Sequence, residues 1–201
     1  VKGAEIIGLI PREALELSAT DLMKPVGFSD EQIFENRLRK ALGEPPATTL
    51  EAFLAALASS SPTPGGGSAA ALSGAMGAAL AGMVGGLTAG KKGYEACDAG
   101  MRAMQSKAQG LRARLERLMD LDSEAFDGVS SAMKLPKFTD TEKAIRSAAL
   151  QKALLAASEV PLETMRACLE VLGLASLAAE EGNVPAVSDA AVSALQDRAG
   201  L

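Results

Sequence analysis

Residues 61–90 read SPTPGGGSAAALSGAMGAALAGMVGGLTAG, and this stretch decides the fold because it carries no charged side chain. It is long enough to cross a bilayer. Its residues, however, are mostly Ala, Gly and Ser, which contribute far less to membrane insertion than Leu, Ile, Phe or Val. The stretch therefore predicts a buried helix of a soluble protein, beginning after the three glycines, rather than a transmembrane segment.

The same stretch places Gly74, Ala78, Gly82 and Gly86 four residues apart, so that they share one helical face. A face without bulky side chains lets a second helix approach closely, either within the subunit or across a dimer. The whole chain is 48% hydrophobic but only 3% aromatic, with no Trp. Its core must therefore be built from Ala, Leu, Val and Met, which favours an all-α protein.

The sequence after residue 47 is helical in pattern throughout. Thr139 and Glu142 form a capping box. Pro161 fits the first turn of a helix, and Gly182 or Asn183 would end that helix in the left-handed conformation. The predicted helices cover residues 50–59, the glycine-following stretch to about 90, 97–131, 143–158, 161–182 and a last segment from Ser188. Roughly five helices with short connections predict an antiparallel helical bundle.

Residues 1–42 have a different pattern. Residues 4–10, AEIIGLI, are apolar and rich in β-branched side chains, which predicts a buried strand, and two short helical segments follow. One strand with two short helices cannot form a core, so we interpret this segment as the end of a larger domain. Residues 43–47, GEPPA, are a stiff linker, and residues 48–201 form the helical domain.

The charges and the missing residue types exclude several functions. The net charge is −5 with no long run of one sign, which argues against a nucleic-acid partner, and the basic residues within 91–117 form either a solvated helix face or an anion-binding surface. The absence of His removes Ser-His and Cys-His dyads and most zinc sites, so no metal site is expected. Cys97 and Cys168 are predicted to be buried thiols in a reducing compartment. The first residues lack the pattern of a signal peptide, which favours a cytoplasmic location.

Residues 61–68 are the first candidate for chemistry. Three consecutive glycines let a ligand lie against the main chain, and the helix that follows offers free N–H groups at its positive end. The alternative interpretation is a flexible linker.

Residues 118–127, LMDLDSEAFD, are the second candidate. Asp120, Glu124 and Asp127 share one helical face, whereas Asp122 lies with Phe126 on another. A carboxylate beside apolar side chains can hold a proton near neutral pH and act as a general acid or base. An exposed acidic face is the alternative.

Two further groups have simple structural explanations. Lys134 and Lys137 follow the acidic helix and, with Arg146 on the next helix, suit an anionic substrate or a solvated loop. Asn183 and Asp189 fit helix-capping positions, which explain them without any function.

Taken together, the segments SPTPGGGSAAALSGAMGAALAGMV, DLDSEAFDGVSSAMKLPK, EKAIRSAALQKAL and GNVPAVSDAAVSAL occur in an order that resembles the formiminotetrahydrofolate cyclodeaminase and methenyltetrahydrofolate cyclohydrolase family. The resemblance covers residues 48–198. The segment VKGAEIIGLIPREAL, within residues 1–42, resembles the last strand and helices of a glutamate formiminotransferase domain. The chain thus looks like part of a fused formiminotransferase-cyclodeaminase.

The resemblance implies an all-α subunit that forms homodimers or higher homo-oligomers, with folate bound near the dimer interface. It implies elimination of ammonia from 5-formiminotetrahydrofolate with ring closure to 5,10-methenyltetrahydrofolate, a step of histidine degradation, and no cofactor beyond the folate. Carried over by motif, Asp122 is the acid–base group. The residues implied to bind the folate, with or without a polyglutamate tail, are Ser61, Pro64, Gly65, Gly66, Gly67, Ser68, Lys134, Lys137, Arg146, Asn183 and Asp189.

Two alternatives stay open. Related proteins of the same fold are methenyltetrahydrofolate cyclohydrolases, which add water instead of expelling ammonia; the transferase-like residues favour the cyclodeaminase, because the transferase makes its substrate. A non-catalytic helical oligomerisation module is the other alternative. The family usually continues past the SD motif with a longer helix, whereas this chain stops at Leu201. The transferase-like segment lacks its catalytic region, so no transferase activity is expected.

Overall fold

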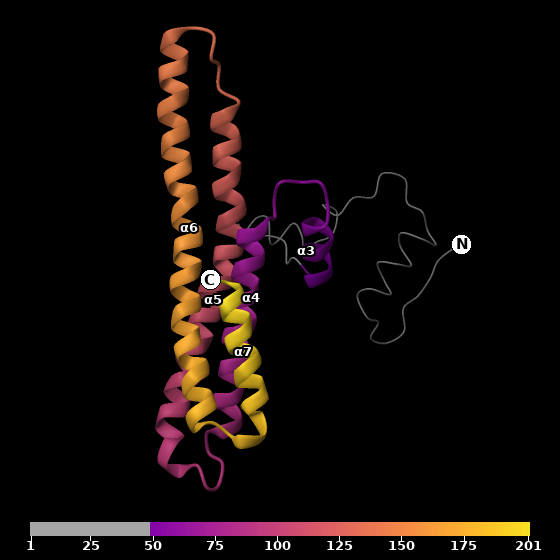
Figure 1. Ribbon diagram of the computed structural model, residues 1–201, viewed down its shortest axis with the longest axis vertical. Coiled ribbons are helices and arrows are strands. Elements are labelled where there is room, and N and C mark those ends of the chain that lie inside the picture. The colour runs from indigo at the N-terminus through magenta and orange to yellow at the C-terminus, as the bar shows by residue number, and fades with distance from the viewer. Residues whose placement is uncertain (1–48) are drawn as a thin grey trace, which may run out of the picture. The chain divides into compact units, whose positions relative to one another are not determined.

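The structure is a computed structural model that describes residues 49–201, and the predicted strand, short helices and linker before residue 48 lie outside the described residues. Residues 51–201 form one compact unit. Within the described residues every regular element is a helix, as the sequence predicts (Figure 1). The α-helices are α3 (Leu50–Leu57), α4 (Gly66–Thr88), α5 (Asp98–Met133), α6 (Asp140–Glu181) and α7 (Val187–Ala199), with short 3₁₀ turns at Glu95–Cys97 and Val184–Ala186.

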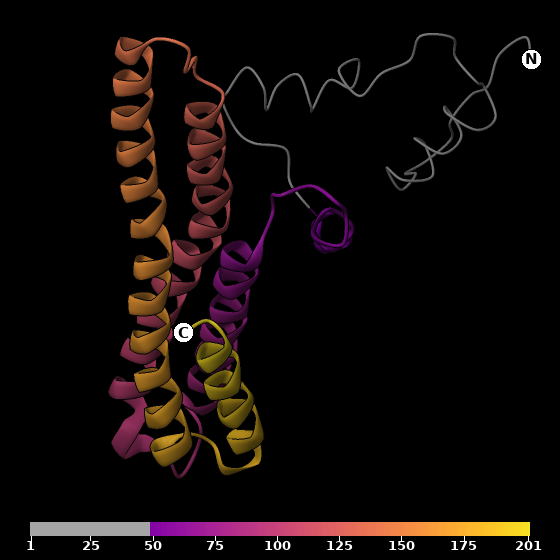
Figure 2. The same ribbon diagram turned by 45° about the horizontal axis from the view of Figure 1, so that its top comes forward.

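The helices α4 to α7 form an antiparallel bundle in which α4 contacts each of the other three. Consecutive helices run in opposite directions (Figure 1). The second half of α5 and the first half of α6 extend beyond α4 and α7 as a two-helix hairpin, which both views show (Figures 1 and 2). The connection between Met133 and Asp140 is the tip of this hairpin.

Small residues in α4 are what allow its neighbours to approach so closely. A Cβ atom added to Gly74 would lie 2.5 Å from the Cys168 sulfur of α6, and one added to Gly82 would lie 3.4 Å from Ala108 of α5. One added to Gly86 would lie 2.8 Å from the Gln105 amide of α5. The predicted small-residue face is therefore used within the subunit.

Helix α4 is also the one described helix that is long and apolar enough to cross a membrane by length and composition. Ten of its residues are buried. Because α4 contacts α5, α6 and α7, its apolar composition is that of a core helix of a bundle.

Several predicted helix ends are confirmed. The Thr139 hydroxyl accepts a hydrogen bond from the Glu142 N–H at 3.2 Å, and the Glu142 carboxylate accepts one from the Thr139 N–H at 2.9 Å, which completes the capping box. The predicted bounds of α4 and α5 agree with the structure within about two residues, which is the usual uncertainty of a helix end.

Three predictions about helix ends are wrong. Pro161 begins no new helix, because α6 is continuous from Asp140 to Glu181. The buried residues of α6 all follow the proline, from Thr164 to Ala178, and the packing of this half in the bundle outweighs the one hydrogen bond that proline removes. Gly182 is extended, with φ −75° and ψ 172°, and not left-handed. A Cβ atom there would lie 2.7 Å from Val84, so space rather than conformation favours glycine. Asp189 is not a helix cap, because α7 begins two residues earlier, at Val187, although the predicted start of this helix near Ser188 is confirmed within one residue.

The basic residues of α5 are mostly paired with carboxylates. Lys107 binds Glu170 of α6 at 3.1 Å, and Arg114 binds both Glu170 and Glu163 of that helix. All of these side chains are partly exposed, and each such pair contributes about 0–1 kcal/mol. The pairs match the interpretation of this stretch as a solvated helix face, with a few contacts that align α5 with α6.

Asp197 of α7 is completely buried, and neither of its carboxylate oxygens has a hydrogen-bond partner among the described residues. Burial raises the pKa of this carboxyl to about 7, although the nearby Ser193 hydroxyl acts in the opposite direction. The effect of burial prevails because the Ser193 hydroxyl donates to the Gly77 carbonyl at 2.8 Å. Between about pH 4 and pH 7, this carboxyl is therefore protonated in the folded protein and ionised in the unfolded chain.

We predict a pH-dependent loss of stability that Asp197→Asn removes. Between the unfolded pKa of about 3.9 and the folded value of about 7, the folded state binds more protons, so the free energy of unfolding falls as pH rises and levels off above pH 7. The fall is at most about 4 kcal/mol at 1.36 kcal/mol per unit. Urea unfolding from pH 5 to 8 measures it, with the exposed Asp120→Asn as the control that keeps the slope. An Asp197→Asn protein with the full wild-type slope would contradict the prediction.

Candidate functional site

The carboxylate of Asp122, on α5, meets the first turn of α4. Its Oδ2 atom accepts a hydrogen bond from the Ser68 N–H at 2.9 Å and another from the Ser68 hydroxyl at 3.0 Å. Ser68 is completely buried, and its hydroxyl also lies 3.0 Å from the Met119 carbonyl. The structure thus joins the glycine-rich segment to the acidic segment, which are separate candidate sites in the sequence.

Gly67 leaves the space that this carboxylate occupies. A Cβ atom at Gly67 would lie 2.6 Å from the Asp122 Cγ and closer still to Oδ1. At the neighbouring Gly66 a Cβ atom would meet nothing within 4 Å, and at Gly65 it would meet only the Pro62 carbonyl at 3.4 Å. Of the three glycines, Gly67 is therefore the one whose missing side chain the site requires.

Asp122 also completes the beginning of α4. The N-cap residue Gly65 has no side chain to accept a hydrogen bond from the free N–H groups of the first turn. The carboxylate from α5 accepts one of them, and its negative charge faces the positive end of the helix dipole. Asp122 thus acts as a helix cap supplied by another helix, so its structural role and any chemical role share one geometry.

The other residues of the predicted acidic face are exposed. Asp120, Glu124 and Asp127 all lie on the outside of α5, whereas Asp122 is half-buried. In the loop before α4 and the first turn of that helix, Ser61 and Gly66 are exposed, and Pro64, Gly65 and Gly67 are partly buried. The loop and Asp122 therefore form one partly open site.

Lys134, Lys137 and Arg146 lie at the tip of the hairpin instead of beside Asp122. Lys134 follows the end of α5, and eleven helical residues separate Asp122 from Met133, a rise of about 17 Å. The Arg146 guanidinium donates to the Met133 carbonyl at 3.2 and 3.3 Å, which ties α6 to the end of α5.

Asn183 and Asp189 lie at the opposite end of α4. The Asn183 N–H donates to the Thr88 hydroxyl at 2.8 Å, and the Asn183 side-chain oxygen accepts from Lys91 at 2.5 Å. Twenty residues of α4 separate Thr88 from Ser68, a distance of about 30 Å along the helix. Asp189, in the first turn of α7, is half-buried at this same end. Within one chain the predicted site residues thus occupy three places along the bundle.

Lys91 and Tyr94 accompany Asn183, and no motif in the sequence predicts their place beside it. Lys91 lies over the ring of Tyr94, 5.5 Å from its centroid, and the Tyr94 hydroxyl accepts a hydrogen bond from the Val184 N–H at 3.2 Å. The sequence places Lys91 only within a basic stretch. Tyr94 is the only tyrosine in the chain and lies three residues after Lys91, which is a signal that the sequence does contain.

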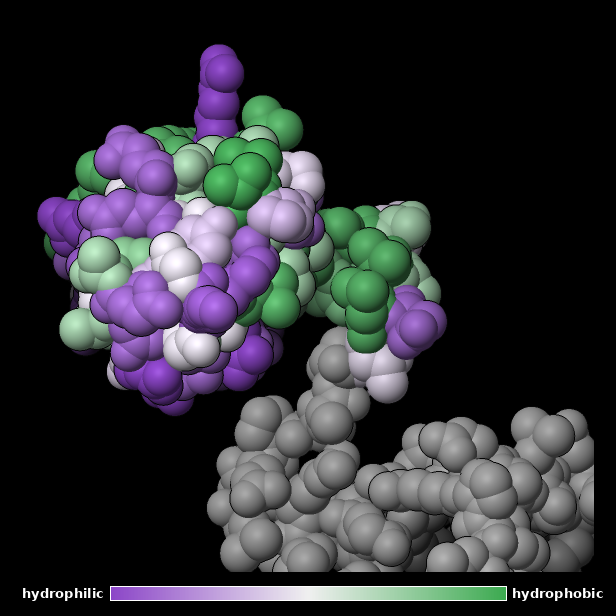
Figure 3. Space-filling model, turned by 90° about the horizontal axis from the view of Figure 1, so that it is seen from below, coloured by the Kyte–Doolittle hydropathy of each residue, from purple (hydrophilic) through white to green (hydrophobic). Residues whose placement is uncertain are grey.

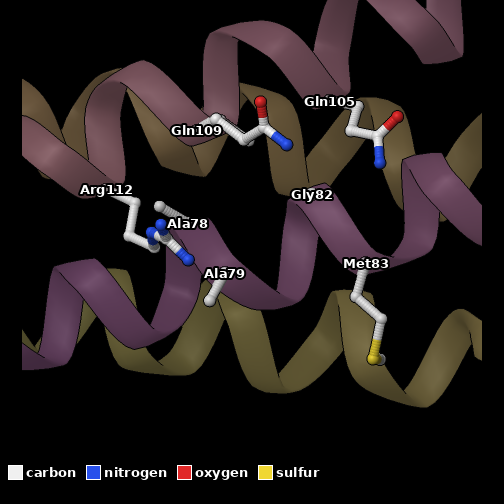
Figure 4. Close-up of a pocket in the computed structure, with 8 residues that line it drawn as sticks. Ala78, Ala79, Gly82, Met83, Gln105, Gln109 and Arg112 are labelled. Atoms are coloured by element: carbon white, nitrogen blue, oxygen red, sulfur yellow. The ribbon is translucent and has the colours of Figure 1, made fainter.

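A groove of about 190 Å³ runs between α4 and α5, away from all of these residues (Figure 4). Small residues of α4 form one side, and polar side chains of α5 form the other. Its lining consists of Ala78, Ala79, Gly82, Met83, Gln105, Ala108, Gln109 and Arg112. None of the predicted site residues belongs to this groove.

The fold and the site together define a class: an all-α antiparallel bundle whose glycine-rich helix start receives a carboxylate from the next helix. Residues 49–201 match the model of the family described as Formiminotransferase-cyclodeaminase, and the chain belongs to this family. The resemblance noted in the sequence is therefore confirmed.

The chain resembles both kinds of enzyme in this family. A methenyltetrahydrofolate cyclohydrolase of Methylorubrum extorquens is 53% identical over 153 residues, which are 76% of this chain and 74% of that protein. A formimidoyltransferase-cyclodeaminase of Sus scrofa is 41% identical over 148 residues, which are 72% of this chain and 27% of that much longer protein. The solved structure of formiminotetrahydrofolate cyclodeaminase from Thermotoga maritima has a TM-score of 0.67 and 34% identity, covering 76% of this chain and 72% of that one.

Two adjacent glycines give a matched test of the site. Gly67→Ala should displace the Asp122 carboxylate and lower the free energy of unfolding by about 1–3 kcal/mol, as overpacking does elsewhere. Gly66→Ala should leave stability unchanged or raise it by up to about 1 kcal/mol, because alanine favours a helix and meets no atom there. Urea unfolding of both variants measures the difference. Equal changes in the free energy of unfolding would contradict the described position of the Asp122 carboxylate beside Gly67.

Proposed function

We propose that this chain acts on the one-carbon bridge of tetrahydrofolate, eliminating ammonia from 5-formiminotetrahydrofolate to form 5,10-methenyltetrahydrofolate. Family membership supports a folate substrate. The observation that carries the proposal within the molecule is the Asp122 carboxylate, held by Ser68 beside a glycine-rich loop. The transferase-like residues 1–42 favour this reaction, because a formiminotransferase produces its substrate. No cofactor beyond the folate is part of the proposal.

The reaction needs one proton to move between two nitrogen atoms. The folate N10 attacks the formimino carbon of the amidinium group and forms a tetrahedral intermediate. Asp122 takes the proton from N10 and gives it to the former imino nitrogen. The carbon–nitrogen bond to that group then breaks, its electron pair leaves with ammonia, and the N5 and N10 lone pairs stabilise the cationic product. One carboxylate thus serves as base and then as acid, which a chain without His can still provide.

The remaining predicted contacts are proposed to bind the rest of the substrate. The backbone of residues 61–68 would lie against the pterin ring, because glycines let a planar ligand approach the main chain. Lys134, Lys137 and Arg146 would attract the glutamate carboxylates, with or without a polyglutamate tail. Asn183 and Asp189 would form hydrogen bonds with polar ring atoms. Since these groups lie far apart in one chain, they need a second chain to form one pocket.

We propose that a homodimer completes the pocket. The outward face of α4 has no charge and exposes Met76, Met83 and Leu87, which are 41%, 41% and 50% accessible. Seen end-on from below, hydrophilic residues cover most of the end of the bundle, and hydrophobic ones gather at its sides (Figure 3). Two copies pairing through α4 in antiparallel fashion would bury this face and place Asn183 and Lys91 of each near Ser68 of the other.

The second candidate function is hydrolysis of methenyltetrahydrofolate, and the 53% identity to a cyclohydrolase favours it. The same carboxylate would then take a proton from the attacking water instead of passing one to an amine. A non-catalytic oligomerisation module is the remaining alternative. All three make different predictions when the two substrates are supplied separately.

The reaction is tested with both substrates and one variant. With 5-formiminotetrahydrofolate, the protein should produce methenyltetrahydrofolate absorbance, and Asp122→Asn should lower kcat about 10²–10⁴-fold, the usual contribution of a general acid–base group. The exposed Glu124→Gln on the same helix is the control and should keep wild-type kcat. If 5-formiminotetrahydrofolate is not converted but supplied methenyltetrahydrofolate loses its absorbance, the protein is a cyclohydrolase instead. If neither substrate is converted, both proposed activities are contradicted.

The composite pocket is tested by mixing two inactive variants. Asp122→Asn and Asn183→Ala dimers, unfolded together and refolded, should recover about a quarter of wild-type activity, because half of the dimers are mixed and each mixed dimer has one intact site. The control mixture, Asp122→Asn with Gly67→Ala, places both changes in the same half of the pocket and should recover nothing. Activity no greater than the sum of the separate variants would show that each chain has a complete site of its own.

A further inference from the structure

We infer that Ser68 is a positioning residue for Asp122, which fixes Oδ2 and directs Oδ1 toward the substrate as the atom that transfers the proton. The inference rests on the proposed function and assigns a task to each oxygen of the carboxylate. Two donors converge on Oδ2, the N–H and the hydroxyl of Ser68. No hydrogen bond from residues 49–201 reaches Oδ1.

The Ser68 hydroxyl has a single proton and several possible acceptors. The Asp122 Oδ2 atom and the Met119 carbonyl both lie at 3.0 Å, and the Ser123 hydroxyl lies at 3.4 Å. The two distances are equal, but a hydrogen bond to a carboxylate is stronger than one to a carbonyl, so the proton goes to the carboxylate. The contact with Met119 keeps the hydroxyl in place, because a completely buried side chain has few other positions.

The carboxylate lies beside Gly67, in the first turn of α4. A Cβ atom there would lie 2.8 Å from Oδ2 and closer still to Oδ1, so Oδ1 is the oxygen nearer to the Gly67 backbone. Asp197 differs from Asp122 in this respect: it also fills the space beside a glycine, but no donor of residues 49–201 reaches either of its oxygens. At Asp122, in contrast, one oxygen is fully engaged and the other is left for a ligand.

The different roles of Oδ1 and Oδ2 follow from the chemistry of the proton transfer. The oxygen that moves the proton must approach N10 and then the leaving nitrogen within about 2.6–3.2 Å. A carboxylate free to rotate would present either oxygen and would lose the alignment between the two nitrogens. Fixing Oδ2 removes that rotation, so that N10–H donates to Oδ1 and the same Oδ1–H returns the proton to the departing amine.

Kinetics of a double-mutant cycle test the inference. Ser68→Ala keeps the backbone donor but removes the hydroxyl, and we expect kcat to fall about 10- to 100-fold with little change in KM, because the lost hydrogen bond is to a charged group. In the Asp122→Asn background the same substitution should change kcat less than twofold, since Ser68 acts only through Asp122. A purely structural role would lower both proteins by the same factor and would overturn the inference.

A second measurement does not depend on turnover. We expect the crystal structure of Ser68→Ala to show the Asp122 carboxylate turned away from the position that it has in a crystal structure of the wild type. Ser123→Ala is the control and should leave the carboxylate in place. An unmoved carboxylate in Ser68→Ala overturns the positioning role. If the wild type turns over neither folate substrate, the proposed function fails, whereas these structures still decide whether Ser68 positions Asp122.

Discussion

The close approach of α4 to its three neighbours is the constraint on which the rest of the structure depends. Three glycines along this helix each admit one side chain from a different helix: Gly67 admits Asp122 of α5, Gly74 admits Cys168 of α6, and Gly77 admits Asp197 of α7. A Cβ atom at any of the three would overlap the incoming group. The bundle therefore closes around a helix whose composition, weakly apolar and without charge, predicts a buried core helix.

Two of these side chains are carboxylates beside a glycine of α4, and the two carboxylates have different surroundings. At Gly67 the incoming carboxylate finds the N–H and hydroxyl of Ser68, because it arrives at the first turn of α4, where N–H groups are free. At Gly77 the incoming carboxylate of Asp197 arrives in the middle of the helix, where every N–H is already used, and burial raises its pKa to about 7. The position along the helix thus decides whether a buried acid is a satisfied, oriented group or a source of pH-dependent instability.

The sequence predicted the fold class, the length of α4 and the capping box well, because these depend on local composition and spacing. It failed at Pro161, where packing of the half of α6 that follows the proline outweighs a local preference for a helix start. It identified Asp122 and the glycine-rich loop but not the contact between Asp122 and Ser68, since spacing places a residue on a helical face without saying which helix end it meets. It could not show that Asn183 lies about 30 Å from Ser68, because the motifs that carry the resemblance are ordered in sequence only.

The proposed role of Asp122 is tested by a crystal structure of the protein with a bound, unreactive folate. With 5-formyltetrahydrofolate, whose formyl group occupies the place of the formimino group, we expect the one-carbon group beside Asp122, within about 3.2 Å of Oδ1. Oδ2 should remain bound to Ser68, and the polar groups around Asn183 should come from the second chain. A folate bound elsewhere, such as in the groove between α4 and α5, with its one-carbon group away from Asp122, would contradict the proposed role of Asp122.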